Sequence, residues 1–426
     1  MIRFVRFARS GCWRDFRGSP MSFELTPTTE AGKRFVAAAQ RLRPTLLERA
    51  DQADRTSTLC RDNFEDLARA GVTGAFVPEE LGGFGLASIH DWIVGIAALA
   101  RGDASTAIAT NMHLAICRAF AHAYNAAGSV PPGDPLREQL SAVAAGRMLI
   151  CATATEAGTD NLHPLTEATR VADGWRIDGT KLFVTLSPAA THLGMNLRIR
   201  DGGQDQIATT LLPIDTPGIV PQDDWDALGM RGSGSQSVRF DNVRVPDYGV
   251  RALAPWGQWS VAMLMNRALA NLPLVGAFLG IAEAAHAIAL EAVASGGRRQ
   301  SSLHTKPGVH HHIAELEIEL AQCRSILQRT GVAVDEFLGV HGVRPPLEAA
   351  HQLMKDYQLA KWVVNRGAIE IVGKAMDLVG GASFMAGHPL ARLYRDVRAG
   401  PFMQPYSPSE ARQYIGQVAL GLLPKE

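Results

Sequence analysis

The hydrophobic periodicity of this 426-residue chain changes twice, and that change restricts the possible folds more than any other feature. From Met21 to about Gly146 the apolar residues recur every three to four positions, as they do on one face of a helix. After Met148 they alternate with polar residues, which is typical of strands. Beyond about Trp256 long helical patterns return. The sequence therefore predicts an α, β, α order along the chain.

Two helices stand out in the first segment. One places Cys60, Phe64 and Leu67 on a single face and ends at Gly71. The other begins at Ser88 and buries an apolar set of side chains, namely Ile89, Trp92, Ile93 and Ile96. These patterns predict an α-helical N-terminal domain.

Short runs of high β propensity follow. They comprise residues 150–155, 175–177, 182–186, 208–212 and 238–245. Asp173-Gly174 and Asp178-Gly179 are predicted to form hairpin turns between short strands, because Asp-Gly pairs favour such turns. The middle of the chain is therefore expected to be an antiparallel β domain.

The last segment contains helical patterns over 313–330 and 347–372, which are long enough for a four-helix bundle. The apolar stretch 269–290 is interrupted by Pro273 and Glu283, so it is interpreted as a buried helix rather than a membrane span. The predicted fold class is α+β. The predicted units are an extension over residues 1–20, a helical domain over 21–146, a β domain over 147–250 and a helical bundle over 251–426.

Charge and cysteine content limit the partners and the compartment. The chain carries 42 basic and 42 acidic residues, so neither a nucleic-acid partner nor a membrane partner is implied. Five scattered cysteines without a C-x-x-C pair favour a reducing compartment, and we expect a cytoplasmic protein.

The first twenty residues hold five arginines against one aspartate. They are either a mitochondrial presequence, which would place the protein in the matrix, or an early start codon before Met21. The second interpretation is favoured, since Thr26 can cap a helix soon after Met21.

Two local motifs have a structural and a functional interpretation. The glycine-rich run 77–85 lacks the strand and helix that a dinucleotide-binding loop requires, so by itself it predicts a tight turn. Residues 154–160 follow a strand and gather hydroxyl, acidic and glycine residues that can bind an anionic ligand. Locally, a strand-end turn satisfied by its own side chains is favoured.

The order of the motifs is more specific than any one of them. The ordered set is V-P-E-E-L-G-G-F-G at 77–85, T-E at 155–156, D-G-T-K-L-F-V-T at 178–185, G-M-R-G-S at 229–233, the segment from Phe240 to Pro246, G-G at 380–381 and L-Y-R-D at 393–396. Together these residues resemble the acyl-CoA dehydrogenase family from about Val77 to Asp396. The resemblance implies an N-terminal helical domain, a middle β domain and a C-terminal four-helix bundle, usually assembled as a homotetramer with FAD between the domains.

The resemblance also implies cofactor-binding residues. Thr155 resembles a residue at the pyrimidine edge of the flavin, Phe183 the aromatic residue beside the ring, and Thr185 a partner near N5. An aromatic face and a few fixed donors are what orienting a flavin requires.

At the other end of the cofactor, Arg298 resembles the family's arginine that reaches the FAD pyrophosphate of a neighbouring subunit. Gly380 and Gly381 resemble the glycine pair that approaches the cofactor. Two departures concern the same regions. The loop after the T-E pair is shorter than in the family, and Ser301 stands where an aromatic residue is common.

The catalytic base expected from the resemblance is missing. Abstraction of an acyl thioester's α-proton needs a carboxylate, and the family usually supplies a glutamate. Gln404 occupies that place, and Asn266 occupies the alternative place on the first bundle helix. A carboxamide does not accept a proton at neutral pH. A shifted register would instead assign the base to Glu410.

Histidines give no firm site. His311 and Glu315 share a helical face, but a metal site needs a third ligand, so no metal is expected. His388 is a candidate for proton transfer, although an exposed loop histidine is the simpler interpretation.

Three functions are compatible with these residues. The leading one is an FAD-dependent oxidoreductase that dehydrogenates an acyl-CoA thioester at the α,β position with a non-standard base, passing electrons to an acceptor. The second is a flavin-dependent monooxygenase on the same fold, supplied with reduced flavin by a reductase. Arg231–Ser235 resembles the R-G-[ST]-G-S run of such enzymes, while the Gly179-Thr180-Lys181 strand start resembles the dehydrogenases. The third is a non-catalytic protein that binds flavin or acyl-CoA.

Overall fold

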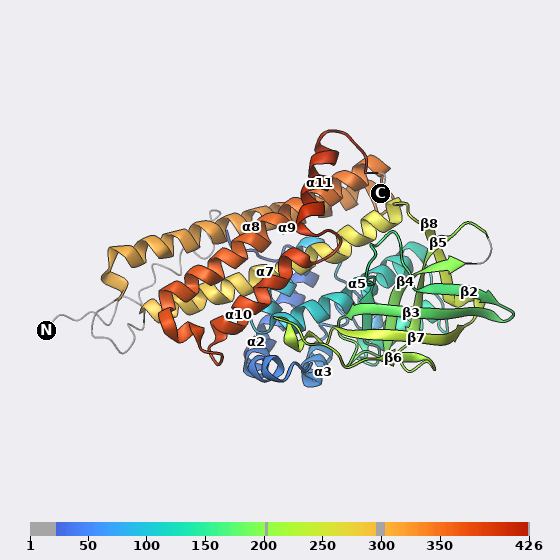
Figure 1. Cartoon of the computed structure of the whole chain (residues 1–426), viewed down its shortest axis with the longest axis horizontal. Coiled ribbons are helices and arrows are strands. Elements are labelled where there is room, and N and C mark those ends of the chain that lie inside the picture. Colours follow the sequence, from blue (N-terminus) through green and yellow to red (C-terminus); the bar gives the residue numbers. More distant parts are fainter. Residues whose placement is uncertain (1–22, 201–202, 295–302, 425–426) are drawn as a thin grey trace.

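The computed structural model describes residues 23–200, 203–294 and 303–424. The predicted extension over residues 1–20, Arg298 and Ser301 lie outside the described residues. The described chain follows the predicted α, β, α order (Figure 1).

The N-terminal part is helical. Its helices are α2 (Glu30–Thr56), α3 (Arg61–Arg69), α4 (Ile89–Ala100), α5 (Ala104–Ala127) and α6 (Pro135–Ala144). The predicted helices correspond to α3 and α4, and Ser88 caps α4 by accepting from the backbone N–H of Asp91. The start expected near Thr26 is wrong, since α2 begins at Glu30 with Thr29 as its cap. The reason is a distant contact: the buried Asp91 carboxylate accepts from the backbone N–H of Thr29 at 2.9 Å and from its hydroxyl at 2.6 Å.

The middle part is one eight-stranded sheet. Its strands are β1 (Ile150–Thr153), β2 (Glu167–Val171), β3 (Gly174–Val184), β4 (His192–Arg200), β5 (Gln206–Pro213), β6 (Ile219–Pro221), β7 (Gln236–Val245) and β8 (Val250–Pro255). They pair in the order β6-β7-β3-β2-β4-β5-β8, with β1 against β4. The pairs are antiparallel except β1 with β4 and β2 with β4, which are parallel. Since β8 pairs with β5, the sheet extends beyond the predicted boundary at residue 250 to Pro255.

One predicted turn is wrong. Asp173-Gly174 does link β2 to β3, but Asp178-Gly179 lies inside β3, which is a single strand rather than two. At Gly179 the register against β7 shifts and φ is +148°. A Cβ there would lie 2.6 Å from Thr166 Oγ1, so the glycine permits a bulge and a close approach rather than a hairpin.

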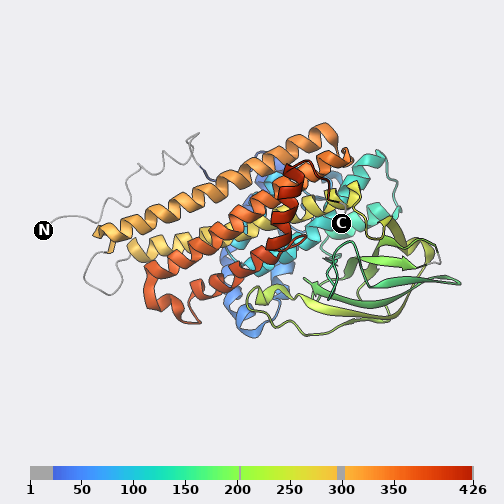
Figure 2. The same ribbon diagram turned by 45° about the horizontal axis from the view of Figure 1, so that its top comes forward.

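The C-terminal part is a helical bundle. It consists of α7 (Val261–Ala294), α8 (Pro307–His341), α9 (Leu347–Val379), α10 (Pro389–Asp396) and α11 (Pro408–Ala419). Figures 1 and 2 both show α7, α8 and α9 side by side, with the sheet beyond one end of them. Helix α7 is long and apolar enough to cross a membrane, but most of it is buried within the protein, as the sequence predicted.

Candidate active site

The side chains of Gln404 and Thr155 meet across the junction of sheet and bundle. Gln404 Nε2 donates to Thr155 Oγ1 at 2.7 Å, although the two residues are 249 positions apart. The other end of the carboxamide, Oε1, is buried and has no hydrogen-bond partner in the described structure. The residue at the family's base position therefore contacts a predicted flavin-binding residue and presents a free acceptor.

Helix α9 fixes the segment that carries Gln404. The ammonium of Lys361 donates to the carbonyl oxygens of Met403 and Tyr406, the latter at 2.7 Å. The Tyr357 hydroxyl donates to the Gln404 carbonyl oxygen at 2.7 Å. Lys361 is 4% exposed, and burial lowers its pKa to about 8. Three bonds from one helix thus set the position of the carboxamide.

Thr185 belongs to a chain of hydroxyl groups. Its Oγ1 lies 2.8 Å from Ser235 Oγ, which lies 2.7 Å from Ser233 Oγ. Both serines come from the run that resembles monooxygenase sequences, and the backbone N–H of Leu186 donates to the Ser233 carbonyl at 3.1 Å. The structure therefore joins the end of β3 to this run and forms a row of small polar groups.

Phe183 presents an aromatic ring at the same end of β3. The residue is 54% exposed and has a backbone φ of +51°, a value that residues other than glycine rarely adopt. The backbone N–H of the preceding Leu182 donates to the Thr155 carbonyl at 2.9 Å. Trp225 packs edge-to-face against the ring at 5.9 Å. A strained, exposed aromatic residue beside Thr155 is suited to contact a ligand. Sequence reasoning missed Trp225, which no motif marks.

The acid of the T-E pair has a structural role. Glu156 is buried, pairs with the ammonium of Lys181 and accepts from the backbone N–H groups of Leu165 and Thr166. Lys181 is itself fully buried. A buried ion pair persists only with such additional hydrogen bonds. Sequence reasoning missed this pair, because Lys181 stands in an exposed-looking strand start.

The rest of the turn after β1 is satisfied by its own groups, as the local interpretation predicted. Asp160 Oδ1 accepts from the backbone N–H groups of Leu162 and His163, and the Thr159 hydroxyl donates to the His163 carbonyl. Thr159 is therefore engaged within the turn.

The remaining predicted residues do not join this cluster. Within the described ranges, neither Asn266 nor the glycine pair hydrogen-bonds to Gln404 or Thr155. Asn266 lies on α7 beside a small cavity of about 40 Å³ that the partly buried Arg267 also lines. Gly380 and Gly381 lie where α9 ends, and a Cβ added to either would meet no heavy atom within 4 Å, which leaves space for a ligand.

The alternative titratable residues have local roles. Glu410 completes the capping box of α11, accepting from the Ser407 N–H at 2.7 Å, so it is held away from a role as base. His388 caps α10 by accepting from the Leu390 N–H at 3.2 Å. Glu315 pairs with Lys374 at 3.2 Å. Among the described residues no group of three or more His, Cys, Asp or Glu side chains is arranged to hold a metal.

The arrangement fits a flavin. A flavin ring needs an aromatic neighbour and hydrogen-bonding groups along its edge. Phe183 is an exposed aromatic residue of the first kind, and Thr155, Thr185 and the unpaired Oε1 of Gln404 are polar groups of the second kind. None of these groups is a proton acceptor at neutral pH.

Comparison with known proteins agrees with this assignment. The chain matches the acyl-CoA dehydrogenase N-terminal domain over residues 29–128, the middle domain over 150–243 and the C-terminal domain over 259–404. It is 35% identical over 400 residues to the L-evernosamine nitrososynthase of a Micromonospora species, covering 93% of this chain and 92% of the relative. It is 34% identical over 402 residues to the amino sugar nitrososynthase DnmZ of Streptomyces peucetius, covering 93% and 95%.

A solved structure is similar over the same length. KijD3 in complex with FMN and dTDP-3-amino-2,3,6-trideoxy-4-keto-3-methyl-D-glucose matches with a TM-score of 0.85 and 33% identity, covering 94% of this chain and 96% of that one. The ordered motifs, the α, β, α architecture and these matches lead to one conclusion. The chain belongs to the acyl-CoA dehydrogenase family and is a flavin-dependent oxidoreductase of that fold.

Proposed function

We propose that this protein is a flavin-dependent monooxygenase that oxidises the amino group of a nucleotide-linked amino sugar. The proposal corresponds to the second of the three functions considered from the sequence. The observation that carries it is the Gln404 carboxamide bonded to Thr155 where a dehydrogenase needs a carboxylate. The nitrososynthase relatives, at 34 to 35% identity over nearly the whole chain, support amine oxidation in particular.

The chemistry needs no carbon acid to be deprotonated. When bound, reduced flavin would supply the electrons that activate molecular oxygen. One oxygen atom goes to the substrate and the other becomes water, so an amine becomes a hydroxylamine. A second round with another reduced flavin and another oxygen gives a nitroso group and two waters. No step removes a proton from carbon, and a carboxamide therefore suffices at this position.

The chain's own residues would bind and orient the amine. Gln404 Oε1 can accept one N–H of the amine, because its Nε2 is already committed to Thr155. Lys361 and Tyr357 hold the segment, so the acceptor is fixed before the substrate arrives. Phe183, Thr155 and Thr185 would hold the flavin. Hydrogen bonding to a fixed acceptor orients the nitrogen lone pair toward the oxidant.

Several finer features are proposals of the same kind. We propose FAD as the flavin, with FMN as the alternative because FMN is bound in the KijD3 structure. Release of the flavin by heat, followed by mass spectrometry, distinguishes the two. We also propose a reductase partner, a homotetramer and a cytoplasmic location.

The test assays one protein preparation for both candidate reactions, amine oxidation and acyl-CoA dehydrogenation. Purified protein with chemically reduced flavin and oxygen is expected to convert a thymidine-diphosphate-linked 3-amino sugar into products heavier by one oxygen and then into the nitroso compound, followed by mass spectrometry. The matched 3-hydroxy sugar is the control and should not react. Anaerobic titration with acyl-CoA thioesters should leave the oxidised flavin spectrum unchanged. Flavin bleaching with enoyl-CoA formation, and no amine oxidation, would instead establish the dehydrogenase.

Gln404→Glu sharpens this comparison, since it changes one group at nearly constant shape. The Thr155 hydroxyl, which accepts from Gln404 Nε2 in the native protein, would have to donate to the carboxylate instead, and a negative charge would replace the neutral donor and acceptor. We expect kcat/KM for the amine to fall roughly tenfold or more, with flavin retained. An unchanged rate would mean that Gln404 does not contact the substrate.

A further inference from the structure

Met230 connects α10 to the loop that leads into β7. Its backbone N–H donates to the Asp396 carboxylate at 2.6 Å. Its carbonyl oxygen accepts from the indole N–H of Trp225 at 3.1 Å and from the backbone N–H of Ser233 at 3.0 Å. A carbonyl oxygen has two lone pairs, so both of its acceptor positions are used. A single residue thus passes the position of α10 to two other residues of the loop.

Trp225 carries the first of these bonds to Phe183, against which its ring packs edge-to-face with the centroids 5.9 Å apart. Residues 222–230 belong to no helix or strand, so hydrogen bonds set the position of Trp225. Its backbone N–H donates to Gln236 Oε1 at 2.7 Å, and its carbonyl accepts from the Ser57 hydroxyl at 2.9 Å. Because an indole has a single N–H, the bond to Met230 is the one that orients the ring beside Phe183.

Ser233 carries the second bond to Thr185. Its hydroxyl begins the row of hydroxyl groups that ends at Thr185. Ser233 is fully buried and is the last residue of the short turn η3 (Arg231–Ser233), for which Met230 is the N-cap. The position of the hydroxyl row therefore follows from that of Met230.

Asp396 holds Met230 in a strained conformation. The φ angle of Met230 is +54°, and residues other than glycine keep such a value only where their surroundings fix it. Asp396 is 1% exposed, so bulk water cannot take the place of the Met230 N–H on its carboxylate. The two backbones also lie in close contact, since a Cβ at Gly229 would lie 2.3 Å from the Arg395 carbonyl oxygen. The end of α10 is thus fixed against Met230.

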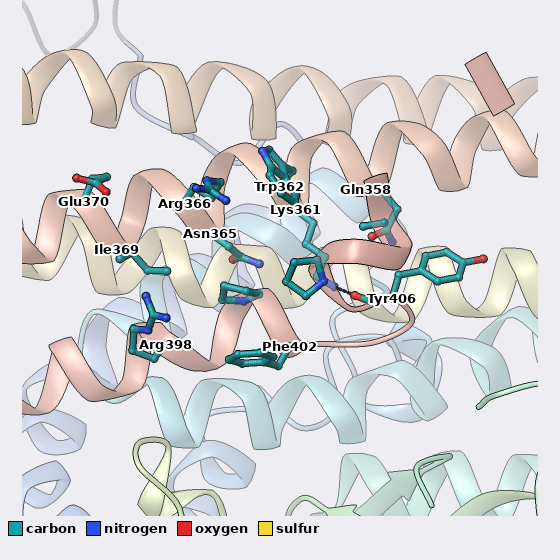
Figure 3. Close-up of a pocket in the computed structure, with 13 residues that line it drawn as sticks. Gln358, Lys361, Trp362, Asn365, Arg366, Ile369, Glu370, Arg398, Phe402 and Tyr406 are labelled. Atoms are coloured by element: carbon teal, nitrogen blue, oxygen red, sulfur yellow. Dashed lines mark hydrogen bonds between the residues drawn. The ribbon is translucent and has the colours of Figure 1, made fainter. Parts of the chain in front are cut away.

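The segment 396–406, which begins at Asp396, also carries Gln404, whose carboxamide bonds to Thr155. Figure 3 shows this segment beside α9, with the bond from Lys361 to the Tyr406 carbonyl oxygen dashed. The segment is therefore fixed to the sheet side at its start and to α9 at its end. Residues of the flavin cluster from two separate parts of the sheet depend on it.

We propose that Asp396 is a positioning residue of the flavin site, which acts through Met230 on Phe183 and Thr185. The carboxylate acts as a fixed hydrogen-bond acceptor rather than as a charge. It keeps the Met230 carbonyl directed at Trp225, and the Trp225 ring in turn keeps Phe183 in place. This role rests on the flavin cluster of the proposed function and does not depend on which substrate is oxidised.

Two substitutions at Asp396 separate the acceptor from the charge. Asp396→Asn keeps an oxygen that accepts from the Met230 N–H, whereas Asp396→Leu is similar in shape and leaves that buried N–H without an acceptor. The full-length variants are labelled with fluorotryptophan, and the fluorine NMR resonance of Trp225 is assigned from Trp225→Phe. Asp396→Leu should shift this resonance, and Asp396→Asn should leave it in place.

Flavin affinity gives the second measurement. The full-length protein is freed of flavin and titrated with FMN and with FAD in separate experiments. Asp396→Leu should raise the Kd of the bound flavin roughly three- to tenfold, and Asp396→Asn should change it less than about twofold. Trp225→Phe keeps an aromatic ring but loses the donor to Met230, and it should raise the Kd by a similar factor as Asp396→Leu. Trp225 is only half-buried, so this variant decides the question if Asp396→Leu does not fold.

Trp175→Phe is the matched control. Trp175 lies at the opposite end of β3 from Phe183, and its indole N–H likewise donates to a backbone carbonyl, that of Asp247, at 3.4 Å. The loss of this bond should change the Kd of the flavin less than about twofold.

Each remaining outcome overturns the proposal. If Asp396→Asn behaves as Asp396→Leu does, the charge and not the acceptor is responsible. If Trp225→Phe binds flavin as the native protein does, or if the Trp225 resonance is unchanged in Asp396→Leu, Met230 does not pass the position of α10 to Phe183. The measurements involve no turnover, so a protein that shows the expected shifts but oxidises no amine would refute only the proposed function.

Discussion

Gln404 shows how much a single residue can say about chemistry. The sequence shows a carboxamide at the position of the base. A carboxamide does not accept a proton at neutral pH, so this side chain cannot act as a general base. The sequence does not show in which direction the Gln404 carboxamide points. The contact with Thr155 and the free Oε1 depend on Lys361 and Tyr357, which lie on another element.

Lys361 gives the residue-scale prediction. Its pKa of about 8 in the folded protein lies below the value of about 10.4 for an unfolded lysine. Between these values the unfolded chain binds more protons, so the free energy of unfolding rises as the pH rises from about 8 to about 10.4. Relative to Lys361→Met, the wild type should gain on the order of 2 kcal/mol between pH 7 and pH 10 in urea unfolding. If the free energy of unfolding changed with pH in the same way in both proteins, burial of the Lys361 ammonium would not lower its pKa as stated.

At the scale of elements, glycines decide how closely helices approach. On α7, a Cβ at Gly276 would lie 2.5 Å from the Ile93 carbonyl oxygen, and one at Gly280 would lie 2.4 Å from that of Ala97. Helices α4 and α7 therefore pack backbone to backbone, which joins the N-terminal part to the bundle. Gly179 acts in the same way within the sheet, where it admits Thr166.

Gly280→Ala is therefore expected to destabilise the protein by about 2 kcal/mol, since one methyl group must displace backbone atoms of α4. The same substitution at Gly373 is the control. Gly373 lies inside α9 with no heavy atom within 4 Å of an added Cβ, so Gly373→Ala should stabilise by about 0.5–1 kcal/mol. Chemical unfolding of the two variants should give shifts of opposite sign. Equal shifts would contradict the close approach of α4 and α7.

At the scale of the whole molecule, α10 connects the three parts of the chain. Arg395 donates two hydrogen bonds, at 2.7 and 2.5 Å, to the carboxylate of Asp54 on α2. The adjacent Asp396 accepts from the backbone N–H of Met230 at 2.6 Å, and Met230 directly precedes the Arg231–Ser235 run that leads into β7. Burial raises the pKa of Asp396 to about 6. The L-Y-R-D motif thus has a structural explanation as the junction of helical domain, sheet and bundle.

Arg395→Ala should cost roughly 3 kcal/mol of unfolding free energy, because it leaves the buried Asp54 carboxylate unpaired. Arg329→Ala is the comparison. Arg329 pairs with Glu336 at 3.3 Å, both side chains are well exposed, and its loss should cost less than about 0.5 kcal/mol. Thermal unfolding at fixed pH measures both. A cost for Arg395→Ala as small as that of the control would mean that this junction is not held by the ion pair.

The sequence by itself determined the α, β, α order, the helices that correspond to α3, α4, α7, α8 and α9, the family and the absence of a carboxylate at Gln404 and Asn266. These features follow from local periodicity, from capping residues such as Ser88 and from side-chain chemistry, all of which short segments carry. Only the tertiary structure decided that β3 continues through Gly179, that Gln404 reaches Thr155, and that Tyr357 and Lys361 of α9 hold the segment beyond α10. Each of these depends on contacts between distant segments, whose packing overrides local turn and strand preferences.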